Sequence, residues 1–210
     1  MWSVRVAVGI LIALQAAAGP SAIRPTVAVW YRGAPAGVPR LDDLAALRAF
    51  GFTTVSWPIE LKKGEPDLRR FAGIVGLAVD VRDPAPPLTA ERALSPTGRV
   101  DLHVDTVSAA DVPALVWRAV AHGARIIAFD PGAGSEAGWT TATGEPAPWV
   151  ASAREIARQF TFNESLIETL RPGPRVVLPS GAPSGLDVVL LAGDRSWVMI
   201  ATNTSRERIR

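Results

Sequence analysis

Short β-branched segments alternate with helical segments along most of the chain, and this alternation restricts the fold more than any other feature. The predicted strands are 26–31, 53–58, 74–81, 99–106 and 125–131. Leu41, Leu44 and Leu47 recur at helical spacing between the first two strands, and Gly51 is a typical stop after such a helix. Because parallel strands need long crossovers, the pattern predicts an α/β fold around about five parallel strands.

Two further helices are expected in the second half of the chain. Ser108 and Asp111 have capping-box spacing ahead of an apolar helical segment at 112–123. A long helical pattern follows from Trp149 to Leu170, and we expect a break near Asn163. These helices belong to the same α/β unit as the strands, over 23–172.

The periodicity changes in the last part of the chain, at 173–210. Short segments at 175–180, 186–193 and 196–203 resemble antiparallel strands, and 192–196 has the composition of a hairpin turn. A hairpin alone is marginally stable, so this region is expected to pack on the α/β unit or to begin a β-domain.

The first 22 residues resemble a secretory signal peptide. Arg5 precedes an apolar run at 6–14, and small residues suited to cleavage lie near Ala18. A membrane anchor is the alternative, but the run is shorter than the roughly 20 residues that span a bilayer. We therefore expect a secreted or periplasmic protein with no stable membrane span after cleavage. The chain has no cysteine, so it forms no disulfide.

Charge and composition exclude some functions. With 210 residues and 48% hydrophobic residues, the chain is expected to fold as one domain with a small appendage. The net charge is only +2, and the basic residues are scattered rather than clustered on one face. We therefore expect no nucleic-acid partner.

Three stretches resemble a known enzyme family. They are "VAVWYRGAPAGVPRLDDLAALRAFGFTTVSWP", "PALVWRAVAHGARIIAFDPGAGSEAGW", and "GEPAPWVASAREIARQF" with "GLDVVLLAGDRSWVMIATNTS". The first is similar to the opening of a (β/α)8-barrel glycoside hydrolase of the β-galactosidase and cellulase kind. The others resemble the last barrel units and the entry to a C-terminal β-domain. The resemblance implies a TIM-barrel-like fold and a carbohydrate substrate.

The middle of the chain departs from that family. A closed eightfold barrel typically takes about 250 residues, and prolines at 84, 86, 87 and 96 interrupt the segment where its middle strands would lie. We therefore expect a shortened, open or incompletely closed sheet with fewer than eight parallel strands. The family's glutamate pair has no clear counterpart. If 99–106 takes the place of the seventh strand, Asp105 lies near the nucleophile position, and no residue clearly matches the acid/base.

Asp105 and Asp130 are the best candidates for a catalytic pair. Both end predicted neighbouring strands, at the edge where parallel sheets carry their sites. Glycoside hydrolysis needs two carboxyl groups across the scissile bond, one of which protonates the leaving oxygen. The alternative role for strand-end aspartates is to cap loops and helices. The acid partner would need a raised pKa, and only Asp130 or Glu136 is placed to supply it.

The remaining candidate residues would bind substrate. Trp30, Tyr31, Trp57 and Trp139 lie at or beyond strand ends, where exposed rings stack on sugars and buried rings form core. Glu60 and Glu136 follow strands and are candidate ligand contacts or solvated charges. His103 is a hydrogen-bonded strand residue or a base. No metal-ligand spacing is present, and no cofactor is expected.

These features predict an exported glycoside-hydrolase-like protein that acts on or binds an oligo- or polysaccharide. Hydrolysis is expected to be weak or absent, because an aspartate is shorter than the family's glutamate. The alternatives are a catalytically silent carbohydrate-binding or scaffold protein, and a truncated inactive gene product. The sequence does not predict the sugar, the linkage or the oligomeric state.

Overall fold

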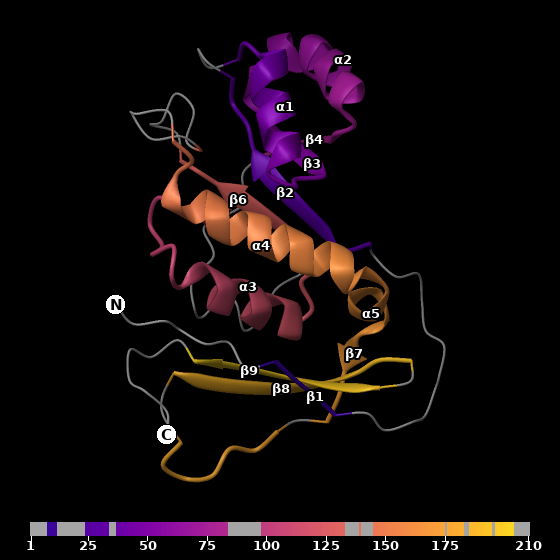
Figure 1. The fold of residues 1–210 in the computed structure, drawn as a ribbon, viewed down its shortest axis with the longest axis vertical. Coiled ribbons are helices and arrows are strands. Elements are labelled where there is room, and N and C mark those ends of the chain that lie inside the picture. The colour runs from indigo at the N-terminus through magenta and orange to yellow at the C-terminus, as the bar shows by residue number, and fades with distance from the viewer. Residues whose placement is uncertain are drawn as a thin grey trace.

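The structure is a computed structural model that describes residues 8–11, 24–33, 37–83, 98–132, 139, 145–174, 176–182, 185–194 and 196–203. Its parallel strands are β2 (Thr26–Trp30), β3 (Thr54–Pro58), β4 (Ala78–Arg82), β5 (Arg99–His103) and β6 (Ile126–Asp130). Its helices are α1 (Leu41–Ala49), the 3₁₀ segment η1 (Ile59–Gly64), α2 (Glu65–Val75), α3 (Val112–Ala121), α4 (Pro148–Phe162) and α5 (Glu164–Thr169). The predicted α/β fold around five parallel strands and the predicted break at Asn163 are confirmed (Figure 1).

The strand order of this sheet is β4-β3-β2-β6-β5, with every neighbouring pair parallel. The chain moves from β2 to β3 to β4, and then from β5 to β6, in the same direction across the sheet. The last parallel strand, β6, pairs with the first, β2. Within the described residues β4 and β5 are the two edges and do not pair, so the prediction of an unclosed sheet with fewer than eight strands is confirmed. The proline-rich stretch at 84–97 lies outside the described residues.

All five α-helices contribute to the core on one face of the sheet. Val29, Val55 and Phe129 point into the same hydrophobic cluster as buried residues of every helix. Leu44 and Leu68 enter it from α1 and α2. Alternate strand residues point to the opposite face, where the buried apolar cluster comprises Ala28, Trp30 and Ala128 and contains no helix residue. Among the described elements, the helices therefore cover one side of the sheet.

The face of the sheet without helices is concave and is lined by polar side chains that contact one another. Arg99 on β5 donates from Nη1 to Asp80 on β4 at 3.0 Å and from Nη2 to Ser56 on β3 at 2.8 Å. In a flat sheet, four strand spacings would separate β4 from β5 by about 19 Å, more than these side chains can span. Ser56 and Asp101 are buried on this inner face. The sheet is therefore strongly curved, and its edges are joined by side chains.

Small residues make room inside the curve. One row across all five strands consists of Ala78, Thr54, Ala28, Ala128 and Asp101. The indole of Trp30 packs with Ala28 and Ala128, which leave space for it. The guanidinium of Arg99 lies 5.7 Å from the centre of the Trp30 ring. Bulky residues at these alanines would force the sheet to open.

A smaller antiparallel sheet packs on the outer side of α3. Its strands are β1 (Val8–Leu11), β9 (Trp197–Asn203), β8 (Leu186–Ala192) and β7 (Arg171–Pro172), in that order. Figure 1 shows α3 between α4 and this sheet. The predicted hairpin is confirmed as β8 and β9, with the Gly193 N–H donating to the Ser196 carbonyl at 2.7 Å. β1 falls within the predicted signal peptide, whose cleavage stays a prediction.

Several predictions of local structure were wrong, among them the strand at 99–106, since β5 ends at His103 and Asp105 lies in the turn after it. Residues 176–179 are not a strand; Pro179 is one of them and Pro174 lies shortly before, and proline lacks the N–H that a ladder needs. α2 continues to Val75 and ends at Gly76, whose φ of +73° forms a left-handed cap, so the strand begins at Ala78 rather than at 74. The capping box before α3 does not form, because Ser108 Oγ accepts from the N–H of Ala110 rather than of Asp111, and the helix begins only at Val112 with no side-chain cap.

Candidate functional site

Asp130, the last residue of β6, holds the guanidinium of Arg32, which lies just beyond the end of β2. Arg32 Nη1 donates to Oδ1 at 2.8 Å and Nη2 donates to Oδ2 at 3.0 Å, so the ion pair is bidentate. The backbone N–H of Gly132 donates to Oδ1 at 2.9 Å. The Asp130 side chain is only 1% exposed. This buried carboxylate therefore fixes the positions of Arg32 and Gly132 at the carboxyl edge of the sheet.

The surroundings of Asp130 keep it ionised. Burial raises its pKa, but hydrogen bonds from Arg32 and Gly132 and the charges of Arg32 and His103 together lower the pKa below its ordinary value. An acid catalyst needs the opposite shift. Asp130 is therefore unsuited to protonate a leaving group, and that part of its predicted role is not supported.

His103 ends β5 directly opposite Asp130 in the parallel ladder. Its Nε2 atom lies 3.7 Å from Oδ2 of Asp130, has no hydrogen-bond partner and is buried. The side chain as a whole is 23% exposed. The imidazole therefore has one side against the buried carboxylate and another side open to solvent.

Asp105 lies in the turn that follows β5 and is exposed. Its Oδ2 atom lies close to Gly132, since a Cβ on that glycine would come within 2.6 Å of it. Gly132 has a φ of +85°, which favours glycine, and its N–H also contacts Asp130. The two predicted carboxylates therefore both border Gly132, one buried and one exposed.

Arg32, His103, Asp105 and Asp130 form what we call the edge cluster. The structure brings together both predicted catalytic aspartates and His103. It adds Arg32, which the sequence interpretation missed. A signal was present, because Arg32 follows Trp30 by two residues and therefore points to the same inner face.

The predicted aromatic platforms are buried in the structure. The exposed fractions are 0% for Trp30, 1% for Tyr31, 0% for Trp57 and 5% for Trp139. Tyr31 packs against Trp57 and Trp139 on the helix-covered side, with ring centres 5.8 and 5.5 Å apart. The Trp57 indole N–H donates to the Leu61 carbonyl at 2.9 Å. Tyr31, Trp57 and Trp139 belong to the core under the helices, and Trp30 is buried inside the curve of the opposite face.

Trp30 contacts the edge cluster through Arg32. The Arg32 guanidinium lies 5.8 Å from its ring centre. Its buried Nε1 atom has no hydrogen-bond partner. The ring therefore supports Arg32 by a cation–π contact rather than presenting a sugar-stacking face.

Of the two predicted glutamates, only Glu60 lies among the described residues. Glu60 lies in η1 and is exposed, and within the described residues it makes no hydrogen bond or ion pair to the cluster. Glu136 lies outside the described residues. Their assignment as substrate contacts stays a prediction.

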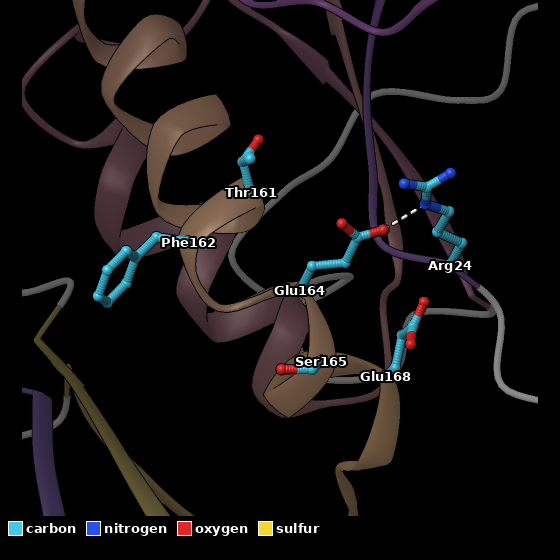
Figure 2. A pocket seen from close by; sticks show the side chains of 6 residues that line it. All are labelled: Arg24, Thr161, Phe162, Glu164, Ser165 and Glu168. Atoms are coloured by element: carbon cyan, nitrogen blue, oxygen red, sulfur yellow. Dashed lines mark hydrogen bonds and ion pairs between the residues drawn. The ribbon is translucent and has the colours of Figure 1, made fainter.

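A shallow hollow of about 420 Å³ lies at the junction of α4 and α5, away from this edge (Figure 2). It is lined by Arg24, Thr161, Phe162, Glu164, Ser165 and Glu168. Arg24 precedes β2 and forms an ion pair with Glu164, which puts the hollow near the amino end of that strand. None of the predicted site residues lines it.

No group of three histidine, cysteine or carboxylate residues suited to a metal ion occurs in the part of the chain that the structure describes. That same part contains no helix with the length and hydropathy needed to cross a membrane. Comparison with protein-family models, curated proteins and solved structures found no match.

Proposed function

We propose that this chain is an exported relative of the barrel glycoside hydrolases that binds an oligo- or polysaccharide at the edge cluster and hydrolyses it weakly or not at all. The observation that carries the proposal is the pairing of the last parallel strand, β6, with the first, β2. This pairing brings Asp130 beside Arg32 at the carboxyl edge, and the pairing of β6 with β5 brings His103 beside Asp130. Enzymes with barrels of parallel strands carry their sites at this edge.

The strand order supports a barrel origin. In a closed eightfold barrel the first strand lies between the second and the eighth, so the order β4-β3-β2-β6-β5 corresponds to barrel strands 3-2-1-8-7. A doubly wound sheet would instead place helices on both faces. The described helices contribute to one face, and the other face curls inward. Three middle strands would be absent from such a barrel.

The polar groups of the edge cluster suit a hydroxyl-rich ligand. Arg32 supplies N–H donors and Asp105 supplies carboxylate acceptors, and both reach solvent, with 21% of the Arg32 side chain exposed. Sugar hydroxyls can donate to the carboxylate and accept from the guanidinium at the same time. Asp130 would act on the ligand through Arg32 and His103, since its own carboxylate is buried.

A catalytically silent carbohydrate-binding protein is the second candidate, and the ion pair of Asp130 with Arg32 favours it. A carboxylate held ionised in this way is not the protonated acid that glycoside cleavage needs. Both candidates bind the same ligand, and only the first allows slow hydrolysis of it.

Calorimetry with cello-, manno-, xylo- and galacto-oligosaccharides tests the binding. One of these series should bind, and Asp105→Asn and Arg32→Gln should each weaken it by about 10-fold or more, because each removes a charge-assisted hydrogen bond worth roughly 1.5–3 kcal/mol. Arg70→Gln, at an exposed position of α2, is the control and should leave the affinity unchanged. Absence of binding in all four series, or equal effects of the three variants, would contradict the proposal.

A further inference from the structure

His103 is the member of the edge cluster best placed to carry a proton. Its buried Nε2 faces the Asp130 carboxylate at 3.7 Å without a hydrogen bond, while 23% of the side chain is exposed. A contact of this length is not yet a hydrogen bond, but catalytic contacts in unliganded sites often shorten when substrate binds. A histidine acid/base has one ring nitrogen beside a carboxylate and exchanges a proton with the substrate through the other. His103 has the first of these contacts, and the exposed part of its ring leaves room for the second.

The charged groups around His103 come from three elements. Asp130 faces it from β6, and Arg32, beyond β2, is bound to that carboxylate. Asp101 shares its face of β5, and Asp105 follows it in the turn. Since Asp130 is held ionised, a positive charge on His103 would have a fixed partner.

We propose that His103 is the proton donor of the edge cluster, with Asp105 as the nucleophile and Asp130 as a positioning residue. This assignment rests on the proposed carbohydrate function, and it gives that function the acid/base residue that the sequence did not identify. The structure favours this assignment over a carboxyl donor, because Asp130 is paired with Arg32 and almost fully buried.

The chemistry balances over two steps. In the first, an Asp105 oxygen bonds to the anomeric carbon, the bond from that carbon to the leaving oxygen breaks, and the leaving oxygen keeps the electron pair and takes the proton from Nδ1 of the imidazolium. In the second, water attacks the anomeric carbon, gives its proton to the neutral imidazole, and releases the Asp105 carboxylate. The sum is hydrolysis of one glycosidic bond by one water molecule.

The dependence on the leaving group tests this role. A 2,4-dinitrophenyl group departs without a proton, whereas a phenyl group needs one, so pairs of 2,4-dinitrophenyl and phenyl β-glucosides and β-galactosides separate proton donation from positioning. General acids contribute roughly 10²–10⁴-fold. His103→Gln should therefore lower kcat at least about 100-fold on the phenyl substrate and less than about 5-fold on the dinitrophenyl substrate.

His122→Gln is the matched control, since the chain has two histidines and His122 pairs with Asp187 beside the small sheet. It should change neither substrate's kcat. Equal losses on both leaving groups in His103→Gln would show a structural role and overturn the proposal, as would full activity of that variant. A wild type that hydrolyses no dinitrophenyl or phenyl glycoside of the panel would also overturn it, while calorimetric binding of an oligosaccharide would still support the proposed function.

Discussion

The guanidinium of Arg99 on β5 lies 3.0 Å from the carboxylate of Asp80 on β4, so one ion pair joins the two opposite edges of the five-stranded sheet. The same arginine donates to Asp101 at 3.0 Å and to Ser56 at 2.8 Å. Burial lowers the pKa of Arg99, and the carboxylates beside it oppose that change. A charge network on the inner face therefore bridges the curved sheet from one edge to the other.

Arg99→Met should destabilise the protein by about 3 kcal/mol, because it breaks the ion pairs of a largely buried guanidinium with Asp101 and Asp80. Urea unfolding followed by tryptophan fluorescence measures the loss. Arg70→Met removes an exposed ion pair to Asp67 on α2 and should change stability by less than about 0.5 kcal/mol. Similar small losses in both variants would show that the inner-face network does not hold the sheet.

Asp130→Asn should make the free energy of unfolding depend less on pH in the acid range. Because the folded-state pKa of Asp130 is below its unfolded value near 3.9, its ionisation stabilises the fold above about pH 4. That stabilisation is lost as the pH falls through the lower folded value. Between about pH 5 and about pH 2, the free energy of unfolding should therefore fall more in the wild type than in the variant.

The same variant should be less stable than the wild type at pH 7, since it leaves Arg32 without its carboxylate. Asp67→Asn, at a 60% exposed position, is the control and should keep the wild-type pH profile. Parallel profiles for wild type and Asp130→Asn would contradict the pKa direction.

Local pattern predicted the five parallel strands and the hairpin, but it also predicted a strand at 175–180 that residues 176–179 do not form. The apolar runs that became β2, β3 and β6 were readable because burial on two sides selects β-branched residues. The sequence also indicates the inner face, because polar residues occupy every second position of the two edge strands. These are Asp80 and Arg82 on β4, and Arg99, Asp101 and His103 on β5. Its curvature was not predictable, because the Arg99 to Asp80 contact joins strands that are far apart in a flat sheet.

Gly132→Ala should weaken oligosaccharide binding by about 10-fold, because the new Cβ would come within 2.6 Å of Asp105 Oδ2 and displace a charged hydrogen-bonding group. It should also lose about 1–2 kcal/mol of stability, since its φ of +85° is unfavourable for alanine. Gly76→Ala is the matched control: its φ is +73°, and no atom lies within 4 Å of the added Cβ. Calorimetry and urea unfolding should show similar stability losses in both variants and an affinity loss in Gly132→Ala alone.

Asp187→Asn should loosen the small sheet from the α/β body. Asp187 on β8 accepts from Arg118 Nε at 3.2 Å and contacts His122 Nε2 at 2.8 Å, and both partners lie on or directly after α3. A hydrogen bond to a charged group contributes about 1.5–3 kcal/mol, and the three side chains are mostly buried, so the variant should lose about 2 kcal/mol. Hydrogen exchange should show faster exchange in β8 and β9 with little change in β2 and β6, since the loss is local to the sheet on α3. Asp194→Asn, exposed in the hairpin turn between the same strands, should leave exchange unchanged. Uniformly faster exchange throughout the parallel sheet would instead mean that the two sheets unfold as one unit.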